Sequence, residues 1–429
     1  MARALLLACI GGLLVLGAAS AAAVPGVSFA KDNAYSAGDG AGAIAVGRLD
    51  ANASLDLVTA NYGDGTVSVL LNRGDGTLSG TSRYGVGYAP LAVAAGDLTG
   101  DGKAEVVTAN FWDDTVSVLL NKGDGTFAPK RDHDVGAPFD VAIGDVNGDD
   151  WEDVVVASDE TGTVGVFLNA GDGSGSLEPR RDYAAGAGTD SVAIADINGD
   201  GKPDLVTANG ASGTVSILLN TGGGSLAPAR EHEVGGGFPS LAARDLNGDG
   251  RIDLAVVSDD GLSVLLQRQD GSFGPARSYP GFGSVSIGDV NGDGKPDLVT
   301  NDFYGAGPAV FVNRGDGTLQ APLRYTGGYQ PILADLNGDG RSDLAGLSEG
   351  NVLVSLNTPA LCNVQPAWNL TLAAARQQLA RANCAVGKVR RVYNKWTKTG
   401  LVLSQKPNFG SVLPGGAKVN LVVSKGKRK

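Results

Sequence analysis

Short apolar runs alternate with clusters of glycine, aspartate and asparagine along most of the chain. Around Asp196 these runs predict four strands, at residues 191–194, 205–208, 215–219 and from 226 to about 234. Valine, leucine, isoleucine and alanine dominate the inner runs, as expected for strands that are buried on both faces. An acidic loop, an Asn-Gly or Asp-Gly turn and an Asn-x-Gly-Asp-Gly-Thr segment separate the runs. The unit is therefore predicted to be a four-stranded sheet.

The acidic segment Asp-Ile-Asn-Gly-Asp-Gly-Lys-Pro-Asp, which starts at Asp196, recurs along the chain. Its other copies start at Arg48 (degenerate), Asp97, Asp145, Asp245, Asp289 and Asp335. Successive starts lie 49, 48, 51, 49, 44 and 46 residues apart, which makes seven units. Four strands per unit of this length predict an all-β, seven-bladed β-propeller. A helical solenoid is disfavoured, because segments with a 3.6-residue period are missing before residue 370.

The two ends of the repeated region are expected to meet. Each of the first six units contains an outer strand, whereas the seventh ends at residues 352–357 without one. Residues 27–35 resemble an outer strand and precede the first acidic loop. We therefore expect this segment to pair into the last blade, which removes both exposed sheet edges. The propeller is predicted to span residues 27–357.

The N-terminus has the pattern of an export signal. Arg3 precedes an apolar run at residues 4–17, and the small residues Ala19, Ala21 and Ala23 follow. Residues 1–23 are predicted to be a cleaved signal peptide, with an uncleaved membrane anchor as the alternative. We therefore expect a secreted protein, extracellular or associated with the cell wall, without a membrane span after cleavage.

Charge divides the chain into two parts. Residues 360–429 contain thirteen lysines and arginines and no acidic residue, which leaves 21 basic and 46 acidic residues before them, a net charge of −25. The boundary lies near residues 357–359. Two cysteines, Cys362 and Cys384, fall in the basic part, and in an exported protein such a pair predicts one disulfide.

The acidic loops have the composition of calcium sites. The pattern D-x-N-x-D-G-x-x-D places carboxylate and amide oxygens at positions 1, 3, 5 and 9, while glycine at position 6 permits a sharp turn. Good turn formers alone would explain one such loop, but not repeated carboxylates that repel one another. The predicted Ca²⁺ ligands are Asp97, Asp101, Glu105, Asp145, Asn147, Asp149, Asp153, Asp196, Asn198, Asp200, Asp204, Asp245, Asn247, Asp249, Asp253, Asp289, Asn291, Asp293, Asp297, Asp335, Asn337, Asp339 and Asp343.

About six structural ions are expected, and the loops are unequal. The loop at Asp97 has Thr99 and Glu105 at positions where the others have asparagine and aspartate, and it is predicted to bind more weakly. Asp150 replaces the position-6 glycine of the next loop, which is unfavourable if the backbone there is left-handed. Arg48 occupies the first ligand position of the first loop, so that loop is predicted to be empty.

With these loops, residues 27–357 resemble the FG-GAP family, including its VCBS-type members, which occurs in the integrin α-subunit propeller and in many exported bacterial proteins. The resemblance implies a seven-bladed propeller with calcium loops on one face. It does not imply a ligand.

Residues 361–426 predict a small α+β domain, followed by a basic tail at 427–429. Residues 371–383 have the apolar spacing of an amphipathic helix with Thr371 as N-cap, and strands are expected at 388–393, 401–405 and 418–423. This segment resembles a PASTA domain in Thr371-Leu-Ala-Ala-Ala, Cys384-x-Val-Gly-Lys-Val, Val402-x-x-Gln-x-Pro-x-x-Gly and Leu413-Pro-x-Gly, although the usual opening is altered to Gln365-Pro-Ala-Trp-Asn. The resemblance implies association with cell-wall peptidoglycan. The positive charge of the module also favours an anionic wall polymer as its partner. The alternative is that the module serves only as a spacer or a pairing domain. Nucleic acid is not an expected partner.

Strand order places a second set of loops on the propeller face opposite the acidic loops. These loops carry Tyr62, Phe111, Trp112, Phe303 and Tyr304, which we predict to bind an unknown glycan or protein. The aromatic residues at the blade links are interpreted as a cap on the core at the mouth of the channel: Tyr88, Phe139, Phe238, Phe282 and Tyr329.

No catalytic residue is predicted. The only histidines, His133 and His232, occupy equivalent points of outer strands, and the chain contains no G-x-S-x-G, HExxH or phosphate-loop motif. We therefore expect a secreted calcium-binding propeller that acts as a ligand-binding or adhesion module and not as an enzyme. The alternative is an extracellular polysaccharide hydrolase or lyase that uses carboxylates on the second face.

Overall fold

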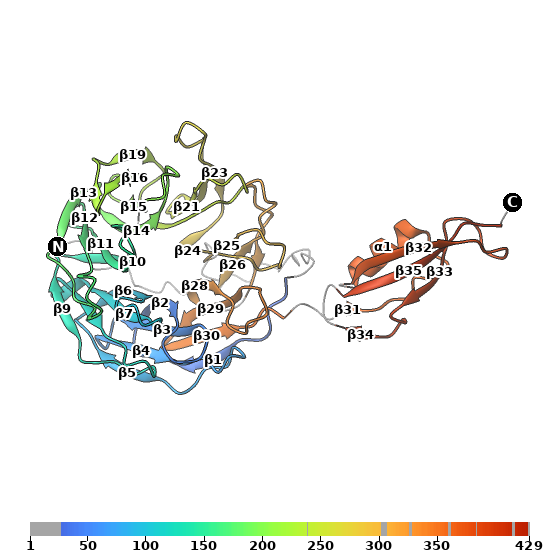
Figure 1. Ribbon diagram of the computed structural model, residues 1–429, viewed down its shortest axis with the longest axis horizontal. Coiled ribbons are helices and arrows are strands. Elements are labelled where there is room, and N and C mark those ends of the chain that lie inside the picture. The colour runs from blue at the N-terminus through green and yellow to red at the C-terminus, as the bar shows by residue number, and fades with distance from the viewer. Residues whose placement is uncertain are drawn as a thin grey trace, which may run out of the picture.

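The repeated part of the protein forms four-stranded antiparallel sheets arranged around a central axis (Figure 1). The computed structural model describes residues 27–237, 239–301, 307–325, 328–358, 362–382, 384–413 and 417–427. Within these ranges there are seven four-stranded sheets. The all-β propeller fold predicted from the sequence is confirmed.

The sheets follow one another in chain order, each from an inner to an outer strand. The first sheet consists of β2 (Ala41–Gly47), β3 (Asp56–Asn61), β4 (Thr66–Leu70) and β5 (Ser82–Gly85), and the second of β6 (Pro90–Gly96), β7 (Glu105–Asn110), β8 (Thr115–Leu119) and β9 (Arg131–Asp134). The third consists of β10 (Pro138–Gly144), β11 (Asp153–Ser158), β12 (Thr163–Phe167) and β13 (Arg181–Ala184), and the fourth of β14 (Thr189–Ala195), β15 (Asp204–Asn209), β16 (Thr214–Leu218) and β19 (Arg230–Glu233). The fifth and sixth consist of β20 (Ser240–Arg244), β21 (Asp253–Ser258), β22 (Gly261–Leu265) and β23 (Arg277–Tyr279); β24 (Phe282–Gly288), β25 (Asp297–Asn301), β26 (Pro308–Phe311) and β27 (Leu323–Arg324).

The last sheet closes the ring. It contains β28 (Tyr329–Ala334), β29 (Asp343–Ser348) and β30 (Asn351–Ser355), and its outer strand is β1 (Asn33–Ser36) from the start of the chain. The two ends pair antiparallel, with Ala34 opposite Leu353. Neighbouring inner strands contact one another in sequence, and β28 contacts β2. The closing pairing predicted from the sequence is therefore confirmed.

Apolar residues fill the space between neighbouring sheets. Most second strands are buried along their whole length, for example β3 and β15. One cluster joins Val58 and Val67 of the first sheet to Val93 and Val106 of the second. Because both faces of each sheet are covered by a neighbour, the inner runs are mostly apolar, and polar residues within them, such as Thr59, Asn61 and Ser68, are buried as well. The predicted fourth strand of the Asp196 unit divides into β19 and a short hairpin, β17 (Asn220–Gly222) with β18 (Ser225–Leu226).

An amide side chain after each third strand links its blade to the preceding one. Asn220 Nδ2 donates to the carbonyl of Val146 in the preceding blade (2.6 Å) and to that of Pro203 in its own blade (2.8 Å). The equivalent donors reach a carbonyl of the preceding blade at 2.5–2.9 Å: Asn72, Asn121, Asn169, Gln267, Asn313 and Asn357. These seven amide clamps run right around the ring, since Asn72 binds Leu336 of the last blade.

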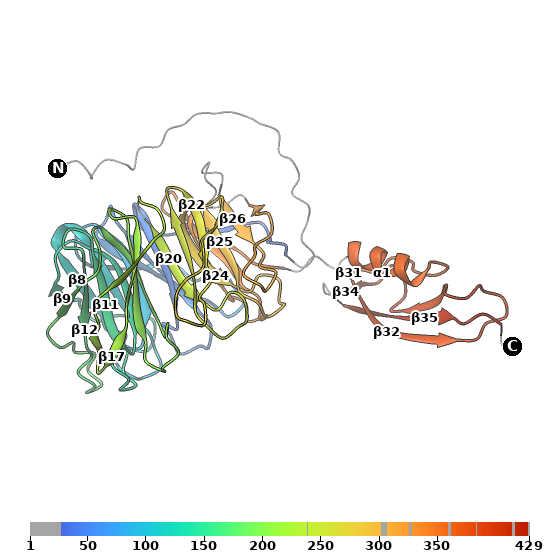
Figure 2. The same cartoon turned by 90° about the horizontal axis from the view of Figure 1, so that it is seen from above.

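The C-terminal module is a small α+β unit. Helix α1 (Leu372–Arg381) lies along one face of a three-stranded sheet in the order β32 (Ala385–Val392), β35 (Lys418–Ser424) and β33 (Val402–Lys406), and a short pair joins β31 (Cys362–Asn363) to β34 (Val412–Leu413) (Figure 2). Thr371 caps the helix, because its Oγ1 accepts the Ala374 N–H at 3.2 Å. The predicted helix, its cap and the three main strands are confirmed to within three residues at their ends.

The predicted signal peptide at residues 1–23 lies outside the described residues and stays a prediction. None of the helices in the described ranges is long and apolar enough to cross a membrane.

Replacing Asn220 by alanine tests the amide clamp. The change removes three hydrogen bonds, including the one that Asn220 Oδ1 accepts from the Gly222 N–H at 2.9 Å. It leaves the carbonyls of Val146 and Pro203 without their donor, so we expect the free energy of unfolding to fall by about 2–4 kcal/mol. Asn220→Asp should be at least as harmful, because a carboxylate oxygen would then face a carbonyl. Equilibrium urea denaturation measures both changes. The exposed neighbour Thr221 is the control, and Thr221→Ala should cost less than about 0.5 kcal/mol. An equally small effect of Asn220→Ala would refute the clamp.

Candidate metal loops and aromatic face

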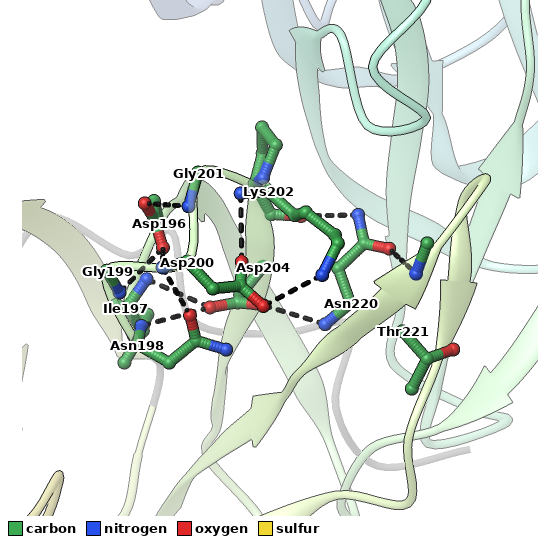
Figure 3. Close-up of polar contacts among 12 residues, drawn as sticks. Asp196, Ile197, Asn198, Gly199, Asp200, Gly201, Lys202, Asp204, Asn220 and Thr221 are labelled. Carbon is green, nitrogen blue, oxygen red and sulfur yellow. Dashed lines mark hydrogen bonds and ion pairs between the residues drawn. The ribbon is translucent and has the colours of Figure 1, made fainter.

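Each acidic loop joins an inner strand to the second strand of its blade, and the loop between β14 and β15 is representative (Figure 3). The first carboxylate, Asp196, accepts the N–H groups of Gly199 at 2.8 Å and Asp200 at 3.1 Å through Oδ1, and that of Gly201 at 2.8 Å through Oδ2. Gly199 and Gly201 have φ angles of +73° and +82°, which suit residues without a Cβ. The loop is therefore folded around its first carboxylate.

The last carboxylate of the loop, Asp204, is fully buried at the start of β15. Its Oδ2 accepts the N–H of Ile197 at 2.9 Å, and its Oδ1 accepts the N–H of Asn220 at 2.7 Å. Burial raises the pKa of Asp204, because removing water from a carboxylate costs more than these backbone hydrogen bonds return. Asp204 thus connects the acidic loop to the amide clamp.

The same arrangement recurs at the other carboxylates of this position. Burial raises the pKa of Asp56, Asp153 and Asp343 to about 6 and that of Asp297 and Glu105 to about 7. The pKa of Asp253 is also raised by burial. A positive charge beside these groups would oppose the effect of burial.

The exposed position-5 carboxylate is paired with a cation of its own loop in three blades. Asp200 Oδ2 lies 3.0 Å from Lys202 Nζ, Asp293 lies 3.8 Å from Lys295, and Asp249 contacts Arg251. These pairs are exposed and stabilise the loop little. A metal ion at the loop would compete with them for the carboxylate.

The loops fit calcium in chemistry more closely than in geometry. They offer hard oxygen donors, but some carboxylate oxygens already accept two N–H groups, as Asp196 Oδ1 does. Yet among the described residues no three acidic or histidine side chains are grouped closely enough to hold a metal ion. A bound ion would therefore require the carboxylates to draw closer together.

Of two loops that depart from the pattern, the one that starts at Asp145 keeps the left-handed backbone, whereas Ala51 and Ala53 of the first loop have no positive φ. Asp150, in place of glycine, has a φ of +69°, and its N–H still reaches Asp145 at 2.9 Å. The left-handed backbone inferred for this position is present. In the degenerate first loop, Asn52 donates to Asp50 at 3.0 Å and to the carbonyl of Asn72 at 2.9 Å. Side-chain amides here make contacts within the loop.

On the opposite face, aromatic side chains of the first three blades form a connected group. Trp112 Nε1 donates to Tyr62 Oη at 3.1 Å, and the Trp112 and Phe111 rings meet edge-on with centroids 5.0 Å apart. Phe111 also meets Phe139 edge-on at 6.2 Å. Trp112 is 50% exposed and Tyr62 38% exposed, so the group presents a surface to solvent. The other two predicted face residues, Phe303 and Tyr304, and the blade-link residue Phe238 lie outside the described residues.

Three of the aromatic residues at the blade links do not cap the core as interpreted from the sequence. Tyr88 is 60% exposed, Phe282 45% and Tyr329 42%. Tyr329 instead donates its hydroxyl to the carbonyl of Ala41 at 2.8 Å, which joins the last blade to the first. Apolar aliphatic residues already fill the blade interfaces, so the link aromatics are left at the surface.

Both histidines lie on outer strands, each against a phenylalanine. His133 packs edge-on against Phe167 at 5.6 Å, and His232 against Phe273 at 5.5 Å. Their equivalent positions in the repeat therefore have a packing explanation.

Family comparison agrees with this architecture. The FG-GAP-like repeat matches at residues 48–108, 97–156, 145–207, 245–300 and 289–346, which together cover more than half of the chain. The chain belongs to the FG-GAP-like repeat family. A PASTA domain matches residues 368–425. No curated protein matches this chain.

Several solved structures share the fold of this FG-GAP-like repeat protein. Virginiamycin B lyase from Staphylococcus aureus is 12% identical with a TM-score of 0.53, over 77% of this chain and 99% of the lyase chain. The periplasmic gluconolactonase of Pseudomonas aeruginosa is 17% identical with a TM-score of 0.51, over 72% and 88% of the two chains. BBS1N, solved in complex with ARL6DN, is 12% identical with a TM-score of 0.56, over 78% and 98%. Identities this low establish the fold alone.

Sequence reasoning treated the Asn-x-Gly-Asp-Gly segment only as a turn and missed the role of its asparagine. The signal was the recurrence of an amide at its first position, including Gln267 in the fifth blade. Its partners lie about 70 residues away, as Gln267 and Ile197 do, so spacing could not identify them.

The first loop, which lacks the full ligand pattern, permits a test of carboxylate burial. Because the pKa of Asp56 is raised to about 6, the folded state holds this proton more tightly than the unfolded state. The stability that Asp56 contributes is present near pH 4 and is lost as the pH rises through about 6. Relative to Asp56→Asn, the free energy of unfolding of the wild type should fall by about 2 kcal/mol between pH 4.5 and 8. Urea denaturation in EDTA measures the difference.

Asp75 serves as the control. It is an exposed turn carboxylate whose pKa is lowered by hydrogen bonds from Thr77. Asp75→Asn should show a smaller change of opposite sign over the same range. A pH-independent difference for Asp56→Asn would contradict the effect of burial.

Proposed function

We propose that the chain is an exported binding protein of the cell wall. In this proposal calcium stabilises the propeller, one propeller face binds a ligand, and the basic module holds the protein at the wall. The observation that carries it is the PASTA-domain match at residues 368–425 in a module without a single acidic residue. PASTA domains associate with peptidoglycan, and a positively charged module also attracts anionic polymers of the wall.

The proposal that calcium stabilises the propeller rests on the composition and shape of the acidic loops. The four loops that start at Asp196, Asp245, Asp289 and Asp335 offer two carboxylates and one amide oxygen around a left-handed glycine, beside a buried aspartate. When bound, the ion would supply the positive charge that these buried and clustered carboxylates lack. Six Ca²⁺ ions would change the net charge of residues 1–359 from −25 to about −13.

Calcium should therefore raise the melting temperature of the protein relative to EDTA, because a ligand that binds only the folded state stabilises it. Asp289→Ala should reduce bound calcium by one ion in equilibrium dialysis and shrink the calcium-dependent increase in melting temperature. Asp50→Ala, in the loop predicted to be empty, is the matched control and should change neither. Equal melting temperatures in calcium and EDTA would refute a structural role for the ion.

A Cys362–Cys384 disulfide would strengthen the small module. Cys384 is 5% exposed within the module core. Cys362 lies on β31, opposite Leu413. Peptide mass spectrometry of the exported protein without reduction tests this pairing, and a free Cys362 would overturn it.

The aromatic group on the second face supports binding more than catalysis. Exposed tryptophan and tyrosine rings, such as Trp112 and Tyr62, stack on sugars or pack against protein side chains. Asp113 is used structurally, since it accepts the N–H of Tyr88 at 2.7 Å. We therefore propose a glycan or protein ligand at this face and no enzymatic reaction.

A pull-down on insoluble cell walls tests whether the basic module or the propeller binds the wall. Full-length protein should be retained with calcium or with EDTA, whereas residues 27–357 alone should stay in solution, because the basic module is the proposed wall anchor. Sedimentation and gel analysis measure the bound fraction. If the propeller alone is retained, and retention is lost in Trp112→Ala, the aromatic face itself binds the wall. Absence of full-length protein from the pellet would refute wall association.

A further inference from the structure

The sheet of the C-terminal module has one covered and one open face. On β35, Val419, Leu421 and Val423 are buried in one cluster with Ala375 and Leu379 of α1, whereas Lys418 and Asn420, which alternate with them, are exposed. Side chains one residue apart on a strand point to opposite faces of a sheet. Lys418 and Asn420 therefore belong to the face that the helix does not cover.

Strand pairing brings further cations onto this open face. Lys406 of β33 lies opposite Asn420, and Arg390 of β32 lies opposite Val422, which shares the face with Asn420. The backbone N–H of Lys388 donates to Asn420 Oδ1 at 2.7 Å, and Lys388 alternates with Arg390 on the same strand. We define the basic sheet face as Lys388, Arg390, Lys406 and Lys418 around Asn420, all of which are exposed.

Nothing in the module neutralises this face. Residues 360–429 contain no aspartate or glutamate. Neighbouring strands lie about 4.8 Å apart, so cations on three adjacent strands repel one another across a narrow strip. Only an anion from outside the module can bind this face and relieve the repulsion between its cations.

The face also carries neutral donors among its charges. Asn420 keeps its Nδ2 donors while its Oδ1 is occupied, and Ser404 lies opposite Val422. Cations mixed with amide and hydroxyl donors suit phosphate oxygens, which accept several hydrogen bonds at once. A flat sheet face suits an extended chain more than a compact ligand.

Aromatic rings with cations follow directly after β32. Lys425 Nζ lies 5.2 Å above the Tyr393 ring, and Lys395 Nζ lies 4.7 Å above the Trp396 ring. Trp396 is 83% exposed and Tyr393 58% exposed. Such rings can pack against the sugar or polyol units of a polymer whose phosphates lie on the basic sheet face.

We propose that the basic sheet face binds a phosphodiester-linked polymer of the cell wall. The inference rests on the proposed wall location and adds the polymer class and the binding surface. A second copy of the chain, in which residues 1–359 carry a net charge of −25, and duplex DNA are the competing anions.

The test compares retention of full-length protein on intact walls and on walls stripped of phosphodiester polymers by hydrofluoric acid. The face variant replaces Lys388, Arg390 and Lys406 by glutamine. The control variant replaces the same number of exposed charges elsewhere in the module, at Arg376, Lys398 and Lys427. We expect stripping or the face variant to weaken retention at least tenfold, and the control variant to weaken it less than threefold. The face variant should also show a shallower salt dependence.

Each outcome separates the explanations once circular dichroism and melting temperature show that both variants are folded. Equal losses in the two variants would overturn the basic sheet face in favour of general charge attraction. Undiminished binding to stripped walls would refute the phosphodiester polymer as the ligand, but not the association of the protein with the wall. Failure to bind either preparation would refute wall association and the inference together. Tighter binding to duplex DNA than to purified poly(glycerol phosphate) would indicate that the basic sheet face binds nucleic acid instead. Self-association that only the face variant abolishes would indicate that it binds a second copy of the chain.

Discussion

A buried carboxylate at the start of each second strand is the interaction on which the propeller depends. Asp204 accepts backbone N–H groups from the acidic loop at Ile197 and from the turn at Asn220. The Asn220 side chain then donates across the blade boundary to Val146. One carboxylate therefore fixes the loop, the turn and the neighbouring blade together. Seven such units make a closed chain of hydrogen bonds around one face of the ring.

The acidic loops and the blade interfaces are consequently coupled parts of one structure. A blade contributes apolar area, but apolar packing is non-directional and does not fix how far one sheet rotates against the next. The amide clamps supply that direction at one end of the blades, and pairing of β1 with β30 prevents the ring from opening. On the opposite face the aromatic side chains Tyr62 and Trp112 meet solvent.

The two parts of the chain distribute charge in opposite ways. The propeller concentrates carboxylates in loops that partly satisfy them with their own N–H groups, as Asp196 does. The module spreads cations over a sheet face with no carboxylate in its own sequence, as at Lys406 and Lys418. In the proposed function, the first arrangement would bind small cations within the fold, and the second would bind a large anion from outside.

The sequence by itself determined the repeat, the four strands of each blade, the closing strand and the α+β module, because these follow from local periodicity and turn chemistry. It also identified the loop carboxylates, whose ligand pattern spans only nine residues. Only the tertiary structure decided that Asn220 clamps two blades, that Trp112 and Tyr62 form a hydrogen bond, and that Tyr88 and Phe282 stay exposed. These contacts join residues of different blades. Their geometry depends on how the sheets rotate against one another, which no single stretch of sequence encodes.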